Sequence, residues 1–235
     1  MPTERTLARA ARDAAPVVVA LALCPLVAAL APGPATPLAH MRALIGAERS
    51  LGLFFEPSVH GWVAAHPPLL GAAQLAYVGV HLPVMLGVLA WVWLARPRAF
   101  QFARNTFVAT QVLAVIGYVL VPTAPPRMVA GLGLGGVETG QHGIERLAQS
   151  PYAAMPSGHV AFALVAAGIV FTLARSRLVR AAALAYPVAV LAEIVATGNH
   201  IWLDAAGGAA VAALGVALAS VRGAPEPQPA GVPAA

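Results

Sequence analysis

The sequence contains no lysine, one cysteine and few charged residues of either sign. Asp, Glu, Lys and Arg make up 10% of the 235 residues, whereas a soluble domain carries roughly 25%. A chain with so few charges cannot solvate a globular surface, so a soluble protein is excluded. The single cysteine, Cys24, excludes a disulfide within the chain, and its place in an apolar run indicates buried packing.

The basic residues are all arginine, and their distribution argues against a nucleic-acid partner. The net charge of +5 and the sequence pI near 10.3 would suit nucleic acid. However, the arginines form short clusters beside apolar runs, and neither a basic stripe nor an aromatic platform for bases accompanies them. Orientation of the chain in a bilayer explains these clusters better.

The sequence is rich in long apolar runs. Hydrophobic residues make up 59% of the chain, and the mean hydropathy is +0.77. We therefore expect an all-α, polytopic membrane protein, with one membrane-embedded domain at 1–221 and a disordered proline-rich tail at 222–235. The runs predict a six-helix transmembrane bundle, with spans at about 14–32, 70–95, 104–122, 159–174, 180–197 and 201–221.

The stretch 41–62 mixes charged and apolar residues ahead of the second span. It predicts an interfacial helix on the outer face, and packing of the same stretch against the bundle is an equal alternative. A further stretch, "GLGLGG" at 131–136, has the spacing of a dinucleotide-binding loop. It follows no strand and opens no convincing helix, so we interpret it as a loop over the site.

The arginines predict the orientation of the spans. Ten of them fall on one side of the predicted membrane: Arg5, Arg9, Arg12, Arg96, Arg98, Arg104, Arg175, Arg177, Arg180 and Arg222. The other side has Arg42, Arg49, Arg127 and Arg146. We therefore expect a multi-pass plasma membrane protein with both termini in the cytoplasm. The first span also resembles a signal peptide, whose cleavage would remove one span without inverting the rest.

Two stretches, "PSGH" at 156–159 and "TGNHIWLD" at 197–204, place a histidine where a predicted span begins. In the predicted topology His159, His200 and Arg127 share the extracytoplasmic face. A helix N-terminus binds anions, above all phosphate. Ser157 is a good N-cap that could also donate its hydroxyl, Gly158 allows close approach to the backbone, and Arg127 can hold phosphate with two parallel hydrogen bonds. Together they predict a phosphate site at the membrane surface.

The spacing of His200 and Asp204 predicts a reactive imidazole. Four residues apart on a helix, the two share one face. The carboxylate can then take one ring N–H and leave the other nitrogen free to attack phosphorus. His159 would protonate the leaving oxygen. Such an apparatus needs no metal and no cofactor.

The other histidines and Glu193 have no assigned part in this chemistry. His60, His66 and His142 read as interfacial residues without a catalytic role. His81 and Glu193 fall inside predicted spans, where an ionisable group marks a functional site or is satisfied by a neighbouring helix. The sequence leaves both possibilities open for this pair.

These residues resemble the type 2 phosphatidic acid phosphatase superfamily. "PSGH" matches its second motif in full, "HIWLD" matches the histidine and aspartate of its third, and Arg127 falls where the arginine of its first belongs. The resemblance covers about 100–204. It implies that His200 becomes phosphorylated, that Asp204 supports it and that His159 is the acid.

The sequence departs from that family at three positions. The lysine of the first motif falls at Leu120, and the serine and arginine of the third fall at Glu193 and Ile194. Asn199 could replace part of the lost donor set. The overall combination resembles more closely the branch of inositol phosphorylceramide synthases and their bacterial relatives, which includes transferases as well as hydrolases.

The predicted function is therefore a membrane lipid phosphatase or phosphotransferase, with a lipid phosphate as substrate and water or an alcohol as acceptor. Two alternatives stay open. A metal-dependent hydrolase could use His159, His200 and Asp204 as ligands, and a proton-coupled transporter could use His81 and Glu193 as a relay.

Overall fold

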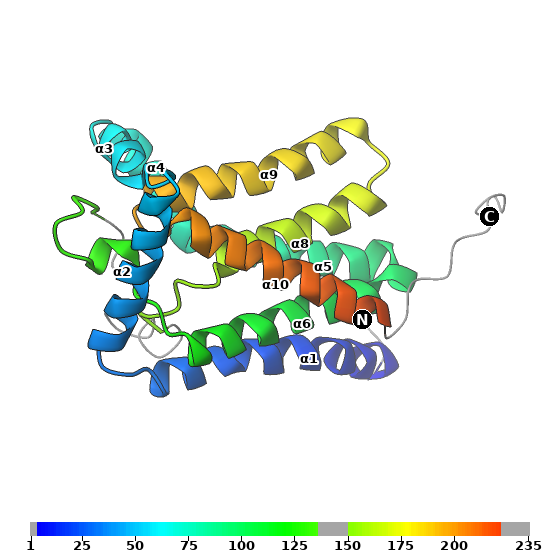
Figure 1. The fold of residues 1–235 in the computed structure, drawn as a ribbon. Helices are drawn as coiled ribbons and strands as arrows, with labels where there is room; N and C mark the ends of the chain where they lie inside the picture. The colour runs from blue at the N-terminus through cyan, green and yellow to red at the C-terminus, as the bar shows by residue number, and fades with distance from the viewer. Residues whose placement is uncertain (1–3, 136–149, 222–235) are drawn as a thin grey trace.

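The computed structural model describes residues 4–135 and 150–221, and their regular structure is helical throughout (Figure 1). This confirms the predicted all-α class. The elements are α1 (Glu4–Ala29), α2 (Ala35–Ser50), α3 (Glu56–Ala64), α4 (Pro67–Gly79), α5 (His81–Ala95), α6 (Pro97–Leu120), the short 3₁₀ helix η1 (Pro126–Met128), α8 (Gly158–Leu173), α9 (Arg177–Ala196) and α10 (Trp202–Val221). The predicted tail at 222–235, together with His142 and Arg146, lies outside the described residues.

Each of the six predicted spans corresponds to helical structure, but not every one is a single membrane-crossing helix. Among the described residues, four helices are long and apolar enough to cross a bilayer: α1, α6, α9 and α10. The pair α4 and α5 makes a fifth if it counts as one bent span. The helix α8 is apolar but has only 16 residues, and a crossing needs about 20. The predicted count of six is therefore not confirmed.

The second predicted span is broken in the middle, where α4 and α5 meet at an angle of 49°. The break follows from Pro83, three residues into α5. Proline has no N–H to donate to the carbonyl four residues earlier, and its ring collides with that carbonyl. The residue four positions before Pro83 is Gly79, which is the last residue of α4. The bend brings the end of α4 and the start of α5 to the cavity described below.

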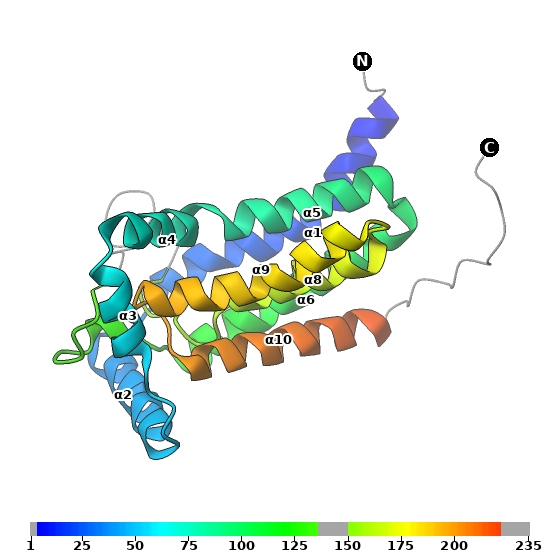
Figure 2. The ribbon, with the colours of Figure 1, turned by 90° about the horizontal axis from the view of Figure 1, so that it is seen from above.

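The long helices lie side by side, while α2 and α3 lie at one end of the bundle (Figures 1 and 2). The α5–α6 and α8–α9 connections lie at the opposite end, near the N-terminus of the described chain. Both connections carry arginines of the ten-residue set. The arginines of these two connections and the helices α2 and α3 therefore lie at opposite ends of the bundle.

The stretch 41–62 does not form the single helix that we expected. It contains most of α2 and of α3, separated by a turn at residues 51–55. The inner face of α2 packs through Met41 and Ile45 against Val129 and Ile201, and all four are buried. Leu51, Leu53, Phe55 and Trp62 remain exposed. The stretch thus combines packing against the bundle with an apolar surface of the kind found at a membrane interface.

The bundle is held together by close approach of small residues. In the membrane no hydrophobic effect drives helices together, so interfaces rely on tight contact between small side chains. In α8, Ala161, Ala163 and Ala166 are buried against neighbouring helices. In α10, a Cβ on Gly208 would collide with the carbonyl oxygen of Ser157. Gly208 thereby allows α10 to lie directly against the start of α8.

The orientation of the bundle can be tested by labelling. Cysteines placed singly at Gly135 and Ser176, in a Cys24→Ser background, should react with an impermeant maleimide from outside and inside the cell respectively. Both positions are exposed, and a Cβ at Gly135 meets only His60 Nε2 at 3.6 Å. Labelling of both from the same side would contradict the assigned topology.

Candidate active site

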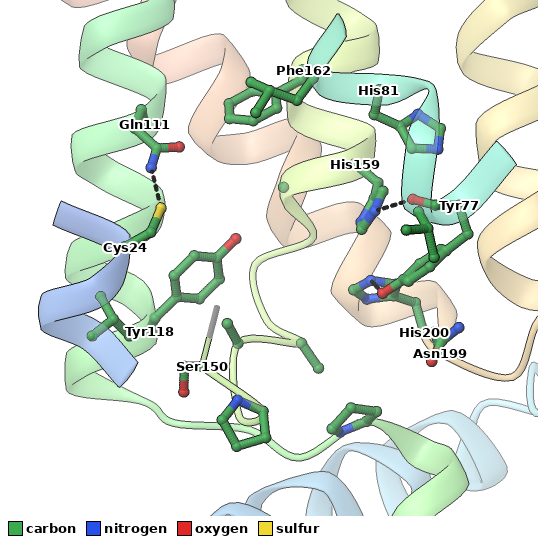
Figure 3. Close-up of a pocket in the computed structure, with 18 of the residues that line it drawn as sticks. Cys24, Tyr77, His81, Gln111, Tyr118, Ser150, His159, Phe162, Asn199 and His200 are labelled. Atoms are coloured by element: carbon green, nitrogen blue, oxygen red, sulfur yellow. Dashed lines mark hydrogen bonds between the residues drawn. The ribbon is translucent and has the colours of Figure 1, made fainter. Parts of the chain in front are cut away.

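A cavity of about 490 Å³ opens among α1, α4, α5, α6 and α8 (Figure 3). Five of the predicted site residues line it: Arg127, Gly158, His159, Asn199 and His200. The histidines and Tyr77 face Cys24, Gln111 and Tyr118 across the cavity. The remaining two predicted residues, Ser157 and Asp204, are fully buried beside it. The structure thus brings together residues from distant parts of the chain.

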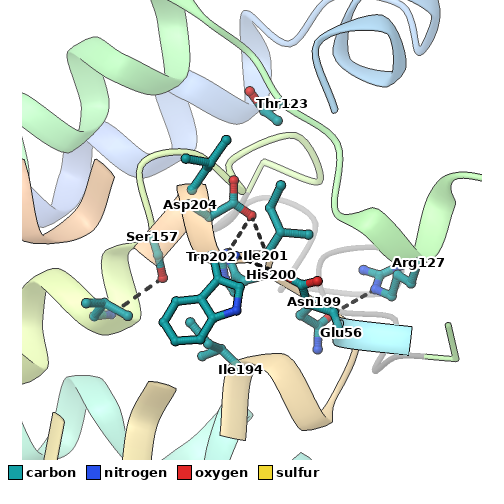
Figure 4. Close-up of polar contacts among 12 residues, drawn as sticks. Glu56, Thr123, Arg127, Ser157, Ile194, Asn199, His200, Ile201, Trp202 and Asp204 are labelled. Carbon is teal, nitrogen blue, oxygen red and sulfur yellow. Dashed lines mark hydrogen bonds and ion pairs between the residues drawn. The ribbon is translucent and has the colours of Figure 1, made fainter. Parts of the chain in front are cut away.

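His200 lies two residues before α10, in the loop that follows α9, and not on the helix as expected. Asp204, in the first turn of α10, reaches back toward it (Figure 4). Asp204 Oδ2 lies 3.4 Å from His200 Nδ1 and accepts a hydrogen bond from the Ile201 N–H at 3.1 Å. His200 Nδ1 makes no hydrogen bond among the described residues, so Asp204 and His200 interact here through charge and not through a directional hydrogen bond. The other ring nitrogen, Nε2, faces the cavity.

His159 is the second residue of α8 and lies next to His200, with the ring centroids 5.5 Å apart. As predicted, Ser157 caps this helix, and its hydroxyl oxygen accepts the Val160 N–H at 3.5 Å. His159 Nε2 lies 3.3 Å from the backbone oxygen of Tyr77. A carbonyl can only accept, so this contact places a proton on Nε2.

The approach to the start of α8 is narrow. A Cβ on Gly158 would lie 2.9 Å from the hydroxyl oxygen of Tyr118. Any larger residue would displace that hydroxyl or the helix. The absence of a side chain at Gly158 thus leaves room for the Tyr118 hydroxyl beside the helix N-terminus, whereas the approach of a ligand to Gly158 stays a prediction.

Arg127 and Asn199 form one unit at the cavity wall. Arg127 Nε donates to Asn199 Oδ1 at 2.7 Å, and the Arg127 N–H donates to the Gly198 carbonyl at 3.2 Å. Asn199 is 1% exposed, and its Nδ2 has no hydrogen-bond partner in the part of the chain that the structure describes. A buried donor without a partner is costly. The unit therefore supplies both a cation and an amide donor suited to phosphoryl oxygens.

Three buried carboxyl groups hold the start of α10. Glu48 Oε1 accepts the Leu203 N–H at 2.8 Å, and Glu56 Oε1 accepts the Trp202 N–H at 3.1 Å. Asp204 Oδ2 accepts the Ile201 N–H. All three residues are 0% exposed. Together their carboxyl oxygens accept from amides that a helix N-terminus leaves without partners. The N-terminus of α10 thus points at these oxygens, and the loop carrying His200 is fixed in place.

Sequence reasoning missed the role of Glu48 and Glu56. The sequence offered one signal for this role, namely two glutamates within the otherwise largely apolar stretch 41–62. Tyr77 and Tyr118 were missed as well, because tyrosines in apolar runs are ordinary interfacial residues.

The carboxyl group of Glu48 should make stability depend on pH. Burial, with a further contribution from the neighbouring Glu56, raises the pKa of Glu48 from 4.5 to about 8, although the bond from Leu203 opposes this. Above pH 4.5 the unfolded chain loses a proton that the folded protein keeps until about pH 8. In that window stability falls as the pH rises.

We therefore expect the thermal unfolding temperature in detergent to decrease between about pH 5 and pH 8. Glu48→Gln retains an oxygen that can accept from Leu203 but cannot ionise, so it should flatten this slope. Equal slopes for the variant and the parent would show that Glu48 is not the group responsible.

His81 and Glu193, whose roles the sequence left open, pair with each other, and His81 also lines the cavity. His81 Nε2 lies 2.9 Å from Glu193 Oε1, and Nδ1 lies 3.3 Å from the Tyr186 hydroxyl. The His81 ring is also edge-on to His159, with centroids 4.7 Å apart. Both members of the pair thus have partners on neighbouring helices.

Two of the histidines interpreted as non-catalytic have structural partners. His60 is buried: Nδ1 donates to the Ala196 carbonyl at 2.8 Å, and Nε2 accepts the Gly135 N–H at 2.9 Å. It ties α3 to the end of α9 and to the glycine-rich stretch, of which residues 131–135 are described. His66 is exposed, and its Nδ1 lies 2.8 Å from the Trp62 carbonyl of its own chain segment.

A comparison with protein families places these features in context. A family model described as the PAP2 superfamily matches residues 42–218. No significant match to the chain was found among curated proteins or among solved structures. The matched region spans most of the chain and contains every predicted site residue, both "PSGH" and "HIWLD" included. The chain belongs to the PAP2 superfamily.

Proposed function

We propose that this protein is a membrane phosphoesterase or phosphotransferase that acts on a lipid phosphate through a phosphohistidine at His200. The observation that carries the proposal is the pairing of two imidazoles in one cavity, with ring centroids 5.5 Å apart. One has a carboxylate 3.4 Å behind its Nδ1, and the other holds a proton on Nε2. Membership of the PAP2 superfamily and the apolar helices are consistent with a phosphatase-type protein in a bilayer.

In the first step, the lone pair of His200 Nε2 attacks phosphorus. A P–N bond forms, and the bond from phosphorus to the leaving oxygen breaks. The electron pair of that bond stays on the leaving oxygen, which takes a proton from the imidazolium form of His159 and leaves that ring neutral. Arg127 and Asn199 Nδ2 hold phosphoryl oxygens, and the Ser157–Gly158 turn presents the N-terminus of α8 to them. The negative charge of Asp204 stabilises the ring of His200 as it becomes cationic.

In the second step, an acceptor hydroxyl attacks the phosphorus bound to His200. It gives its proton to His159, a P–O bond forms, and the electron pair of the P–N bond returns to Nε2. Water as acceptor gives a phosphatase, whereas an alcohol such as inositol or a lipid headgroup gives a transferase. The sequence resembles the inositol phosphorylceramide synthase branch, which contains both transferases and hydrolases, so both acceptors belong to the proposal.

The setting proposed for the reaction is the outer leaflet of the plasma membrane. The cavity lies toward the end of the bundle where α2 and α3 are found, away from the arginine-bearing connections. With those arginines in the cytoplasm, the site opens on the extracytoplasmic side.

The proposal can be tested with purified protein in detergent and a panel of lipid phosphates. Released phosphate and phosphorylated alcohol products should both be measured, with inositol and glycerol offered as acceptors. We expect turnover of at least one lipid phosphate and a radiolabelled phosphoenzyme that survives alkali but not acid, as a P–N bond does. A protein that turns over lipid phosphate without any such intermediate would contradict the mechanism.

A chelator distinguishes the proposed mechanism from the metal-dependent alternative. The described residues contain no group of three or more His, Cys, Asp or Glu side chains placed to hold a metal ion. We predict that turnover in EDTA equals turnover in its absence. Loss of activity on chelation, with recovery on adding zinc or magnesium, would support a metal site instead.

A further inference from the structure

Tyr77, near the end of α4, contacts both histidines of the site. Its ring stacks on His159, with centroids 4.2 Å apart and an interplanar angle of 22°. Its hydroxyl oxygen lies 3.4 Å from His200 Nε2. Its backbone oxygen accepts from His159 Nε2 at 3.3 Å. One residue therefore engages the reactive nitrogen of each histidine (Figure 3).

The Tyr77 hydroxyl lies 3.4 Å from His200 Nε2, beside the nitrogen at which phosphorus must arrive. Asp204 lies behind His200 Nδ1, so Nε2 is the nitrogen that faces the cavity. An unprotonated Nε2 accepts from the tyrosine hydroxyl in the resting state. When phosphorus binds to that nitrogen, its oxygens occupy the space next to it, within reach of the same hydroxyl.

Few positively charged side chains line the cavity and could bind these oxygens. Arg127 is the one arginine among the described residues that line it, and much of the remaining lining is apolar. Neutral donors aimed at a developing negative charge are effective in such a site, because the donors are already oriented. Tyr77 is stacked on His159 and bonded through its backbone, so its hydroxyl is held in place before substrate arrives.

We propose that Tyr77 is a catalytic residue, whose hydroxyl moves its hydrogen bond from His200 Nε2 to an oxygen of the phosphoryl group during transfer. This inference rests on the proposed function of His200. It gives the cavity a donor beyond Arg127 and Asn199, and it explains why a tyrosine lies between the two histidines. The same hydrogen bond to Nε2 keeps the His200 ring oriented in the empty site.

Tyr77→Phe tests this proposal, because phenylalanine keeps the stacking on His159 and removes only the hydroxyl. We expect kcat on p-nitrophenyl phosphate and on dioctanoyl phosphatidic acid to fall about 10²-fold, as when one donor to a developing oxyanion is removed. The rate of phosphoenzyme formation should fall in parallel, and inhibition by vanadate should weaken. KM and the thermal unfolding temperature should change little.

Tyr186→Phe is the matched control. It removes another tyrosine hydroxyl that lies 3.3 Å from a buried histidine, His81, but Tyr186 does not line the cavity. We expect its kcat to stay within about twofold of the parent. An unchanged or increased kcat in Tyr77→Phe, while His200→Ala still abolishes the phosphoenzyme, would overturn the role of Tyr77 alone. A phosphoenzyme that persists in His200→Ala would overturn the proposed function itself.

Discussion

Replacing His200 with alanine should abolish turnover of every substrate and remove the phosphoenzyme. Without the imidazole there is no atom to accept phosphorus, and the remaining donors of the cavity can only bind the phosphate group. Loss of a nucleophile typically costs as much as loss of the whole catalytic set, which in a serine protease is about 10⁶-fold. The measurement is phosphate release together with radiolabel retained on protein that has been quenched in alkaline detergent.

Two further variants test whether the loss of activity is specific to the His200 imidazole. His66→Ala removes an exposed histidine whose Nδ1 lies 2.8 Å from the Trp62 carbonyl, and it should retain full activity and labelling. Asp204→Asn keeps the His200 nitrogen but removes the charge behind Nδ1, so it should lower turnover to a level between those of the parent and His200→Ala. A phosphoenzyme in His200→Ala would show that another residue is the nucleophile.

The parts of the site that could be predicted from the sequence are those that depend on neighbours in the chain. Ser157 caps the helix that begins at Gly158, because capping involves residues three positions apart. The pairing of Asp204 with His200 also follows from local spacing, although the helix begins after His200 and Asp204 reaches back to it. The convergence of Arg127 with the two histidines followed from predicted topology alone.

The parts that could not be predicted depend on contacts between distant segments. Glu56 and Glu48 bind amides that are 146 and 155 residues further along the chain, and no periodicity encodes such a contact. The break after Gly79 is a local effect of Pro83, yet proline is often tolerated within a transmembrane helix, where neighbours satisfy the freed carbonyl. Tyr77 lies two residues before that break and contacts both histidines.

The division of labour between the histidines predicts a dependence on the leaving group. General acid catalysis contributes roughly 10²–10⁴-fold, and most of this matters only when the leaving oxygen is basic. The alkoxide released from an alkyl lipid phosphate is strongly basic and needs the proton of His159. The p-nitrophenolate ion is a weak base and departs without help. His159→Ala should therefore lose far more activity on dioctanoyl phosphatidic acid than on p-nitrophenyl phosphate.

Two comparisons make this prediction decisive. With p-nitrophenyl phosphate, His159→Ala should still form the phosphoenzyme, and label should accumulate if hydrolysis of the P–N bond also needs His159 to take a proton from water. His200→Ala should show no such accumulation on either substrate. His159 also stacks on Tyr77, so His159→Gln, which can still donate a hydrogen bond but not a proton, separates packing from proton transfer. Equal losses on the two substrates for both His159 variants would show that His159 is not the acid and that its part in the cavity is to position Tyr77.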